Sequence, residues 1–310
     1  MADTSCVPTI EIACDGIDQD CDRADLCYLR DDATLSGDLD DEGYGAAVAW
    51  RSGDLWVGAP FDPAGGRVYR EDALVRVGGP FLGTALAAAD AGMMVGADGS
   101  VEDSSGASVT SAAGIGGVIA ARGAHWVSRS GTGVYWDDLT TTELDARPDS
   151  LVLTGDHEVA AGFAFGATAV RFGSASLGRT SHDELGWAMI AYDIDGDGVD
   201  EWIVGAPAGN RVDVLDRTTL ALKTSWTAGT GRFGHALASD DTFVYVGAPT
   251  AGSDAQGAVW KCTPATGDCA LLETGEHPQD LLGFSLATGG GNVFLGAPGG
   301  PGTAGYVLVR

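Results

Sequence analysis

Closely spaced carboxylates are the residues of this chain best suited to chemistry, and the densest set lies between residues 193 and 201. The segment reads Asp-Ile-Asp-Gly-Asp-Gly-Val-Asp-Glu. Oxygen ligands at its first, third, fifth and ninth positions and a main-chain carbonyl at the seventh could surround calcium, with Gly198 permitting the sharp turn. An EF-hand would require a bidentate acid at position twelve, where the chain has Val204. The alternative is a solvated acidic turn without metal, in which the carboxylates would repel one another.

A second group of carboxylates lies near the start of the chain, among four of the six cysteines. Its acids recur at a spacing of two or three and are Asp15, Asp18, Asp20 and Asp22. Gly16 permits a turn, and Cys14 and Cys21 bracket most of the segment. These carboxylates could hold a second calcium ion. The alternative is a disulfide-stapled acidic segment without a tightly bound metal, because thiols locked in disulfides cannot act as ligands.

The cysteines themselves predict disulfides rather than a zinc site. Their count is even, no Cys-x-x-Cys occurs, and the five histidines are scattered singly. Disulfides in turn indicate an oxidising compartment. Cys262 and Cys269 flank a six-residue turn and are expected to pair across a hairpin. The pairing of Cys6, Cys14, Cys21 and Cys27 stays open.

A repeated phrase supplies the elements that must position these groups. It begins with an aromatic residue or Leu before Gly, continues through small apolar residues, and ends in Gly-Ala-Pro. The four clear copies begin at Tyr44-Gly45, Leu185-Gly186, Phe233-Gly234 and Leu282-Gly283, and two weaker copies begin at Leu82-Gly83 and Ile115-Gly116. The interval 186 − 116 = 70 is twice the usual spacing and predicts a hidden unit near Leu151. Seven units result.

Each unit reads as four short strands. In the copy at Leu185 the expected strands are 185–192, 202–204, 211–215 and 220–226. Seven four-stranded antiparallel units predict an all-β fold, a seven-bladed β-propeller. The last copy has residues for three strands only, so residues 28–36 are expected to supply its outer strand and close the ring. The predicted domains are a Cys- and Asp-rich metal-binding leader, 1–27, and the propeller, 28–310.

With its Phe-Gly start and Gly-Ala-Pro end, the phrase resembles the FG-GAP repeat, the blade unit of the integrin α-subunit propeller and its bacterial relatives. The resemblance covers residues 28–310 and implies a calcium-binding loop in one blade. The implied ligands are Asp193, Asp195, Asp197, the Val199 carbonyl and Glu201. Glu201 stands where the family loop usually has Asp. Residues 14–22 resemble the short Cys-Asp-Gly metal-binding repeat of bacterial secreted and surface proteins, known as MopE-type.

Charge and length exclude several functions. With 17 Lys and Arg against 44 Asp and Glu, the net charge is 17 − 44 = −27, which would repel nucleic acid. No window reaches the roughly 18 apolar residues of a membrane span. The sequence predicts a secreted or cell-surface protein that binds calcium and acts as a binding or adhesion module. Its expected partner is a protein or glycan ligand of a cell surface or matrix, and we expect a monomer.

Catalytic motifs do not occur in the sequence, and we therefore expect a protein that is not an enzyme. There is no Gly-x-Ser-x-Gly, no His-Glu-x-x-His and no phosphate-binding Gly-x-x-x-x-Gly-Lys motif. The densest titratable cluster with a histidine is His182-Asp183-Glu184, which is expected in an exposed loop between blades. The alternative function is an extracellular propeller hydrolase acting on glycans or lipids.

Overall fold

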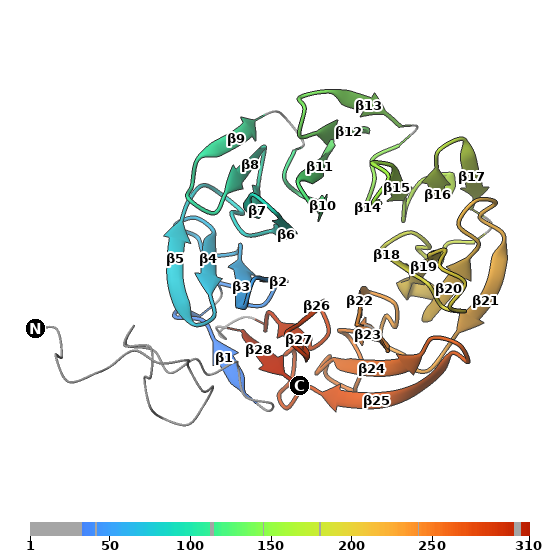
Figure 1. Ribbon diagram of the computed structural model, residues 1–310. Coiled ribbons are helices and arrows are strands. Elements are labelled where there is room, and N and C mark those ends of the chain that lie inside the picture. The colour runs from blue at the N-terminus through green and yellow to red at the C-terminus, as the bar shows by residue number, and fades with distance from the viewer. Residues whose placement is uncertain are drawn as a thin grey trace, which may run out of the picture.

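Seven four-stranded antiparallel sheets form the computed structural model, which describes residues 33–310 except 41, 112–114, 145, 180, 241 and 301–304. The sheets stand side by side around a common axis (Figure 1). The one helix in the described part of the chain is a single 3-10 turn, η1 (Pro207–Gly209). The predicted all-β fold with seven four-stranded blades is confirmed. The leader, 1–27, lies outside the described residues.

Within each blade the strands follow one another from the axis outward. The first blade contains β2 (Ala47–Arg51), β3 (Asp54–Ala59), β4 (Arg67–Arg70) and β5 (Ala73–Val77), and the second contains β6 (Ala85–Ala89), β7 (Gly92–Ala97), β8 (Ser100–Asp103) and β9 (Ser108–Ser111). The third contains β10 (Ile119–Arg122), β11 (His125–Ser130), β12 (Gly133–Trp136) and β13 (Thr141–Glu143), and the fourth contains β14 (Ser150–Leu153), β15 (Val159–Gly162), β16 (Thr168–Phe172) and β17 (Ala175–Gly178).

The remaining blades follow the same order. The fifth contains β18 (Met189–Tyr192), β19 (Glu201–Ala206), β20 (Arg211–Leu215) and β21 (Leu222–Trp226), and the sixth contains β22 (Ala236–Ser239), β23 (Val244–Ala248), β24 (Ala258–Thr263) and β25 (Asp268–Thr274). The seventh contains β26 (Ser285–Gly289), β27 (Asn292–Ala297), β28 (Tyr306–Val309) and, outermost, β1 (Thr34–Ser36). β1 pairs antiparallel with β28. Of the segment 28–36 expected to supply this strand, the structure describes 33–36.

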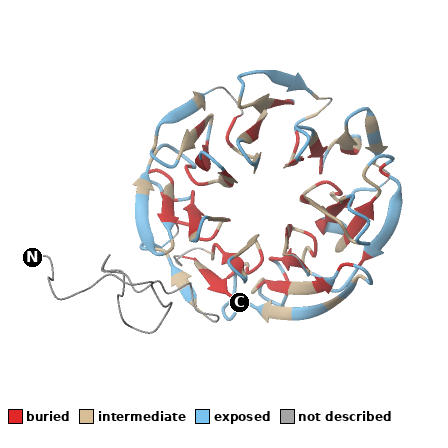
Figure 2. Cartoon of the chain, in the orientation of Figure 1, coloured by how far each residue is buried: buried red, intermediate tan, exposed pale blue. Residues whose placement is uncertain are grey.

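Burial follows the order of the strands, with the second and third strands of each blade inside and the fourth strand outside (Figure 2). In the fifth blade all residues of β19 are buried, whereas most of β21 is exposed. Apolar residues such as Ile203 and Val214 pack against Val244 of the next blade. The core therefore lies between adjacent blades, as expected for units that bury their faces only against neighbours.

The repeated glycines are explained by contacts between blades. At the junction of the fifth and sixth blades, a Cβ on Gly205 would lie 1.9 Å from the Gly234 carbonyl oxygen, closer than any side chain allows. Gly234 itself has φ of +97°, a conformation that glycine adopts at little cost. Six junctions repeat this contact: Gly58 with Gly83, Gly96 with Gly116, Gly162 with Gly186, Gly205 with Gly234, Gly247 with Gly283, and Gly296 with Gly45.

The junction between the third and fourth blades is built differently. Ser128 stands where other blades have the Gly of Gly-Ala-Pro, because it pairs with the first residue of the innermost strand. Asp149 takes the other glycine position, since its N–H donates to the Gly162 carbonyl as Gly234 N–H does to Gly247. The hidden unit near Leu151 is therefore confirmed as a blade, and Asp149 replaces its signature glycine.

Three of the four strand ranges predicted for the fifth blade differ from the structure: β19 is longer, at Glu201–Ala206, and β21 begins at Leu222. The first strand of the fifth blade begins at Met189 rather than at Leu185. Gly186 adopts φ of +98°, and its N–H donates to the Gly205 carbonyl, so residues 185–188 form the turn that joins two blades.

The predicted hairpin disulfide is present. Cys262 on β24 and Cys269 on β25 face each other in register and are bonded through sulfur. Cys262 is buried among the apolar side chains between the fifth and sixth blades. Within the described residues, no helix is long and apolar enough to cross a membrane.

Candidate functional site

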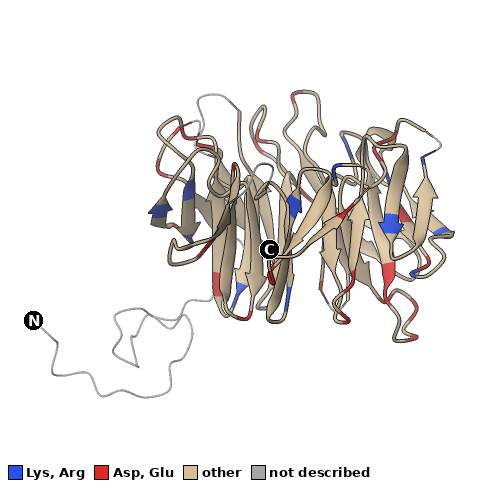
Figure 3. Cartoon of the chain, turned by 90° about the horizontal axis from the view of Figure 1, so that it is seen from above, with Lys and Arg blue, Asp and Glu red and all other residues tan. Residues whose placement is uncertain are grey.

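The predicted metal loop connects β18 to β19, on the face of the ring that carries the first-to-second and third-to-fourth strand connections. We call this the lower face, and the opposite face, which carries the second-to-third strand connections and the joints between blades, the upper face. Figure 3 shows acidic residues in loops at both faces. Gly196 and Gly198 have φ of +77° and +86°, so the chain turns twice within the loop. The local sequence therefore folds into a tight acidic loop at the end of a hairpin.

Main-chain donors fix the first carboxylate of the loop. Asp193 Oδ1 accepts hydrogen bonds from the N–H groups of Gly196 and Asp197 at 2.7 and 3.2 Å, and its Oδ2 accepts one from Gly198 at 2.8 Å. These bonds, that from Gly198 above all, lower the pKa of Asp193 below its usual value. The carboxylate is therefore held in its charged form.

Three predicted ligands come together. One carboxylate oxygen from each of Asp193, Asp195 and Asp197 lies within 4.8 Å of the other two. Val199, the predicted carbonyl ligand, lies in the same turn, where its N–H donates to Asp197 Oδ1 at 2.8 Å. The donor set is made of hard oxygen atoms and fits calcium.

Glu201, the fourth predicted acid, is placed differently. It is the first residue of β19, only 4% exposed, and its Oε2 accepts the Ile194 N–H at 3.0 Å. Its Oε1 contacts the Lys223 ammonium at 2.5 Å, and the same ammonium lies 2.9 Å from Asp195 Oδ2. The charge of Lys223 therefore bridges two of the four acidic ligands.

Sequence reasoning missed Lys223. It lies on β21, the outer strand of the same blade, 22 residues beyond Glu201, so only the pairing of three strands brings it to the loop. Hydrogen bonds to Glu201 and then to Asp195 raise the pKa of Lys223. Lys223 therefore stays charged, and its positive charge offsets part of the negative charge that a bound metal cation would otherwise neutralise.

The second predicted metal group cannot be placed. Asp15, Asp18, Asp20 and Asp22 lie outside the described residues.

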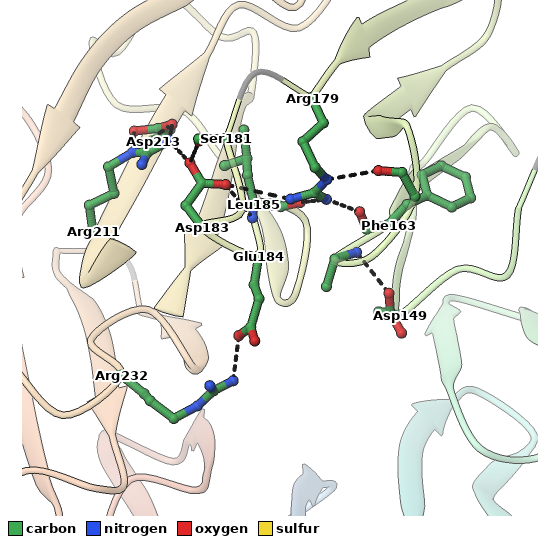
Figure 4. A network of polar contacts seen from close by, with 12 residues as sticks. Asp149, Phe163, Arg179, Ser181, Asp183, Glu184, Leu185, Arg211, Asp213 and Arg232 are labelled. Atoms are coloured by element: carbon green, nitrogen blue, oxygen red, sulfur yellow. Dashed lines mark hydrogen bonds and ion pairs between the residues drawn. The ribbon is translucent and has the colours of Figure 1, made fainter. Parts of the chain in front are cut away.

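The His182-Asp183-Glu184 cluster lies in the predicted loop between two blades, where His182 is exposed but Asp183 is buried. Asp183 is only 7% exposed, and its Oδ2 pairs with Arg211 at 2.6 Å (Figure 4). Burial acts to raise its pKa, but the hydrogen bonds from Ser181 and from the Leu185 N–H, with the Arg211 pair, outweigh burial and lower the pKa to about 2. The burial of Asp183 was not predicted, because Arg211, its ion-pair partner, comes from β20.

Arg179 ties together the loops of the fourth and fifth blades beside Asp183. Its guanidinium donates to the main-chain carbonyls of Phe163, Gly166 and Leu185, the last two at 2.8 Å (Figure 4). Next to it, Glu184 pairs with Arg232 at 2.6 Å. The charges of Asp183 and Glu184 are thus engaged in contacts between adjacent blades, whereas His182 is exposed.

A row of rings extends across the upper face from this network. Phe165 lies 6.0 Å from Trp187, Trp187 lies 5.2 Å from His235, and His235 lies 5.0 Å from Phe284, measured between ring centroids. Burial, followed by the charge of Arg232, lowers the pKa of His235 to about 4, so its imidazole is neutral at pH 7. The upper face of the propeller therefore presents aromatic side chains over the fourth to seventh blades.

Two of the cavities of the protein lie at the upper face beside arginine side chains. One, of about 610 Å³, lies beside Phe165 and Arg179, over the fourth and fifth blades. The other, of about 380 Å³, is lined by residues that include Phe81, Arg129 and Arg147, over the second to fourth blades.

Comparison with protein-family models found no match, and comparison with curated protein sequences found none either. Among solved structures, the computationally designed Ika8 protein is similar with a TM-score of 0.56 and 16% identity, covering 89% of this chain and 99% of the other. The WD40 β-propeller domain of Doa1 is similar with a TM-score of 0.62 and 11% identity, covering 90% of this chain and 95% of the other. At such identities the likeness shows the fold alone. This chain is a seven-bladed β-propeller.

Proposed function

We propose that the protein is a calcium-binding propeller of FG-GAP type that acts outside the cell as a binding or adhesion module. The main support for this proposal is the loop in which Asp193, Asp195 and Asp197 bring carboxylate oxygens within 4.8 Å of one another. Like charges at this distance are costly, and a divalent cation would offset the cost. The ligands would be these three side chains, the Val199 carbonyl and Glu201.

Lys223 adds a feature to this proposal. Calcium and the Lys223 ammonium compete for Asp195 and Glu201, because both are drawn to the same carboxylates. Binding calcium would therefore require Lys223 to move away from at least one of its two partners. We expect weaker binding than four free acids would give, a range suited to the high calcium levels outside cells.

The extracellular location draws support from the Cys262–Cys269 disulfide, because such bonds persist in oxidising compartments. The leader acids Asp15, Asp18, Asp20 and Asp22 would form a second, MopE-type calcium site. Adhesion is proposed because repeat resemblance, acidity and disulfides are shared with surface-displayed propellers. An array of glycans and matrix proteins would test that part of the proposal.

Thermal unfolding with calcium and with a chelator tests the metal site. A ligand that binds only the folded protein stabilises it by about 2.7 kcal/mol at one hundred times its Kd, so calcium should raise Tm. To isolate the propeller loop, the measurement uses a chain that lacks residues 1–26. Asp195→Ala should abolish the calcium-dependent shift, whereas Asp138→Ala, an exposed acid in another turn of the lower face, should leave it unchanged.

Lys223→Met sharpens the same experiment. It removes the competing ammonium while keeping an unbranched side chain, so calcium should bind several-fold more tightly by isothermal titration calorimetry. The proposal fails if calcium leaves the melting curve of the truncated chain unchanged, or if Asp195→Ala responds to calcium as the parent does.

A further inference from the structure

The cavity of about 380 Å³ on the upper face is lined by two arginines, Arg129 and Arg147. Its walls come from the joints before the second, third and fourth blades, from the second-to-third strand connection of the second blade, and from β11 with the turn that follows it. Its size falls near the lower end of the roughly 300–1,000 Å³ usual for small-ligand sites. It adjoins the one junction at which Ser128 and Asp149 replace the paired glycines.

Arg129 and Arg147 bring two positive charges to this cavity. The Arg129 guanidinium lies over Gly117, where a Cβ would be 2.0 Å from its Nη2, and Nη1 donates to the Pro148 carbonyl at 3.4 Å. Burial, and then the charge of Arg147, lower the pKa of Arg129. Neither guanidinium lies within ion-pair distance of a carboxylate of the described residues, although the charge of Asp149 is near enough to act on both.

The other upper-face arginines near the fifth and sixth blades differ in this respect. Arg179, Arg211 and Arg232 each pair with an acid at a blade joint. In a chain with 44 acidic and 17 basic residues, two adjacent arginines without such a partner stand out. An anionic ligand could form the close ion pairs that these two arginines lack, because the planar guanidinium binds carboxylates through two parallel hydrogen bonds.

The other residues that line the cavity indicate which class of anion it could bind. Asp98 lies on the wall and would repel a multiply charged group such as phosphate, but its carboxylate can accept hydrogen bonds from hydroxyl groups. The Thr84 hydroxyl can donate or accept in the same way. Phe81 is 50% exposed, with φ of +59°, and offers an apolar ring to the C–H face of a sugar.

We infer that this cavity binds a carboxylate-bearing sugar, a uronic-acid residue of an acidic glycan. Arg129 and Arg147 would hold the carboxylate, Phe81 would pack against the sugar ring, and Thr84 and Asp98 would bond its hydroxyls. The inference deepens the proposed binding function by naming a ligand class. It does not depend on calcium in the loop of the fifth blade, which lies on the opposite face.

The test is isothermal titration calorimetry of the full chain with digalacturonate, and with neutral digalactose as the uncharged counterpart. Digalacturonate should bind and digalactose should bind at least about tenfold more weakly, because bonds to charged groups contribute about 1.5–3 kcal/mol. Arg147→Gln, an exposed position, should weaken digalacturonate binding about tenfold. Arg70→Gln, an exposed arginine of β4 outside the cavity, should have no effect.

Two further binding measurements test the inference. Phe81→Ala should weaken binding without changing Tm, since the ring is half exposed. Binding should persist in a chelator, so loss of calcium binding and loss of sugar binding are separate outcomes. Equal affinity for digalactose, unchanged binding by Arg147→Gln, or tighter binding of an acidic tripeptide would each overturn the inference.

Discussion

Between the fifth and sixth blades Gly205 and Gly234 bring their main chains into direct contact, whereas between the third and fourth blades Ser128 and Asp149 hold the corresponding positions. The Ser128 hydroxyl is used within the third blade, where it accepts the Gly116 N–H at 3.0 Å and donates to the Val118 carbonyl at 3.1 Å. The comparison shows that the repeated glycines serve close blade packing, and that polar side chains can replace them.

Two carboxyls at neighbouring junctions extend the comparison. Asp183, at the joint of the fourth and fifth blades, pairs with Arg211, and its pKa is lowered to about 2. Asp149, at the irregular junction, accepts the Ala164 N–H at 2.7 Å, but burial outweighs this bond and the nearby arginines and raises its pKa. The joint of the fourth and fifth blades thus holds a fully charged acid, while the irregular junction holds an acid that is easier to protonate.

The largest expected effect is at a regular junction. Gly247→Ala would place a Cβ 2.0 Å from the Gly283 carbonyl oxygen, so the main chains of two blades would have to separate. We expect the free energy of unfolding to fall by about 4 kcal/mol or more in urea denaturation. Gly178→Ala, where nothing lies within 4 Å, is the matched control and should change stability by less than about 1 kcal/mol. Equal effects would refute the packing role of the glycines.

The junction of the seventh and first blades tests whether glycine contacts suffice to hold a ring together. It has the regular Gly296–Gly45 contact, but its blade takes β1 from the other end of the chain. Deleting residues 1–36 should cost about 2–4 kcal/mol, because β28 loses its partner and Leu35 its packing. Deleting residues 1–26 should cost nothing measurable in the same denaturation. Equal stability of the two truncated chains would mean that β1 does not close the ring.

The effect of Asp183→Asn on the free energy of unfolding should depend on pH, which tests the electrostatic difference between the two junctions. Because the folded pKa of Asp183 is lowered from 3.8 to about 2, its stabilisation is present above pH 4 and is lost as the pH falls through 2. At pH 7 the substitution should cost about 2 kcal/mol, and the cost should shrink toward pH 2.

Asp149→Asn is the control with the opposite sign. A raised folded pKa favours folding at low pH and disfavours it as the pH rises, so the neutral amide should cost nothing or stabilise at pH 7. Urea denaturation of both variants from pH 7 downward gives the two slopes. If both variants show the same slope, the contrast between the two junctions is not electrostatic.

The smallest loss of stability is expected from removing the serine of the irregular junction. Ser128→Ala leaves the buried Gly116 N–H without its acceptor and should cost about 1–2 kcal/mol in urea denaturation. Ser108→Ala, on the exposed edge strand β9, should change stability by less than about 0.5 kcal/mol. A cost as large as that of Gly247→Ala would mean that the serine, like the glycines, sets the spacing of the blades.

The sequence was sufficient for the blade count because glycine spacing repeats along the chain, and even the unit without a signature was found near Leu151. It was also sufficient to place Asp193, Asp195 and Asp197 together, since a short loop fixes their distances locally. Lys223 and Arg211 could not be predicted, because each reaches its acidic partner only through the pairing of strands within a sheet or across a blade joint. The burial of Asp183 could not be predicted for the same reason.

The paired glycines also constrain how such a chain can diverge. Each contact joins residues of two successive repeats, so a side chain introduced on one glycine is tolerated only if the facing position changes as well. The third and fourth blades illustrate this, because both positions have changed, to Ser128 and Asp149. The two residues of each contact between repeats therefore have to change together. A repeat that is duplicated or exchanged alone would bring only one of the two residues of each contact with it.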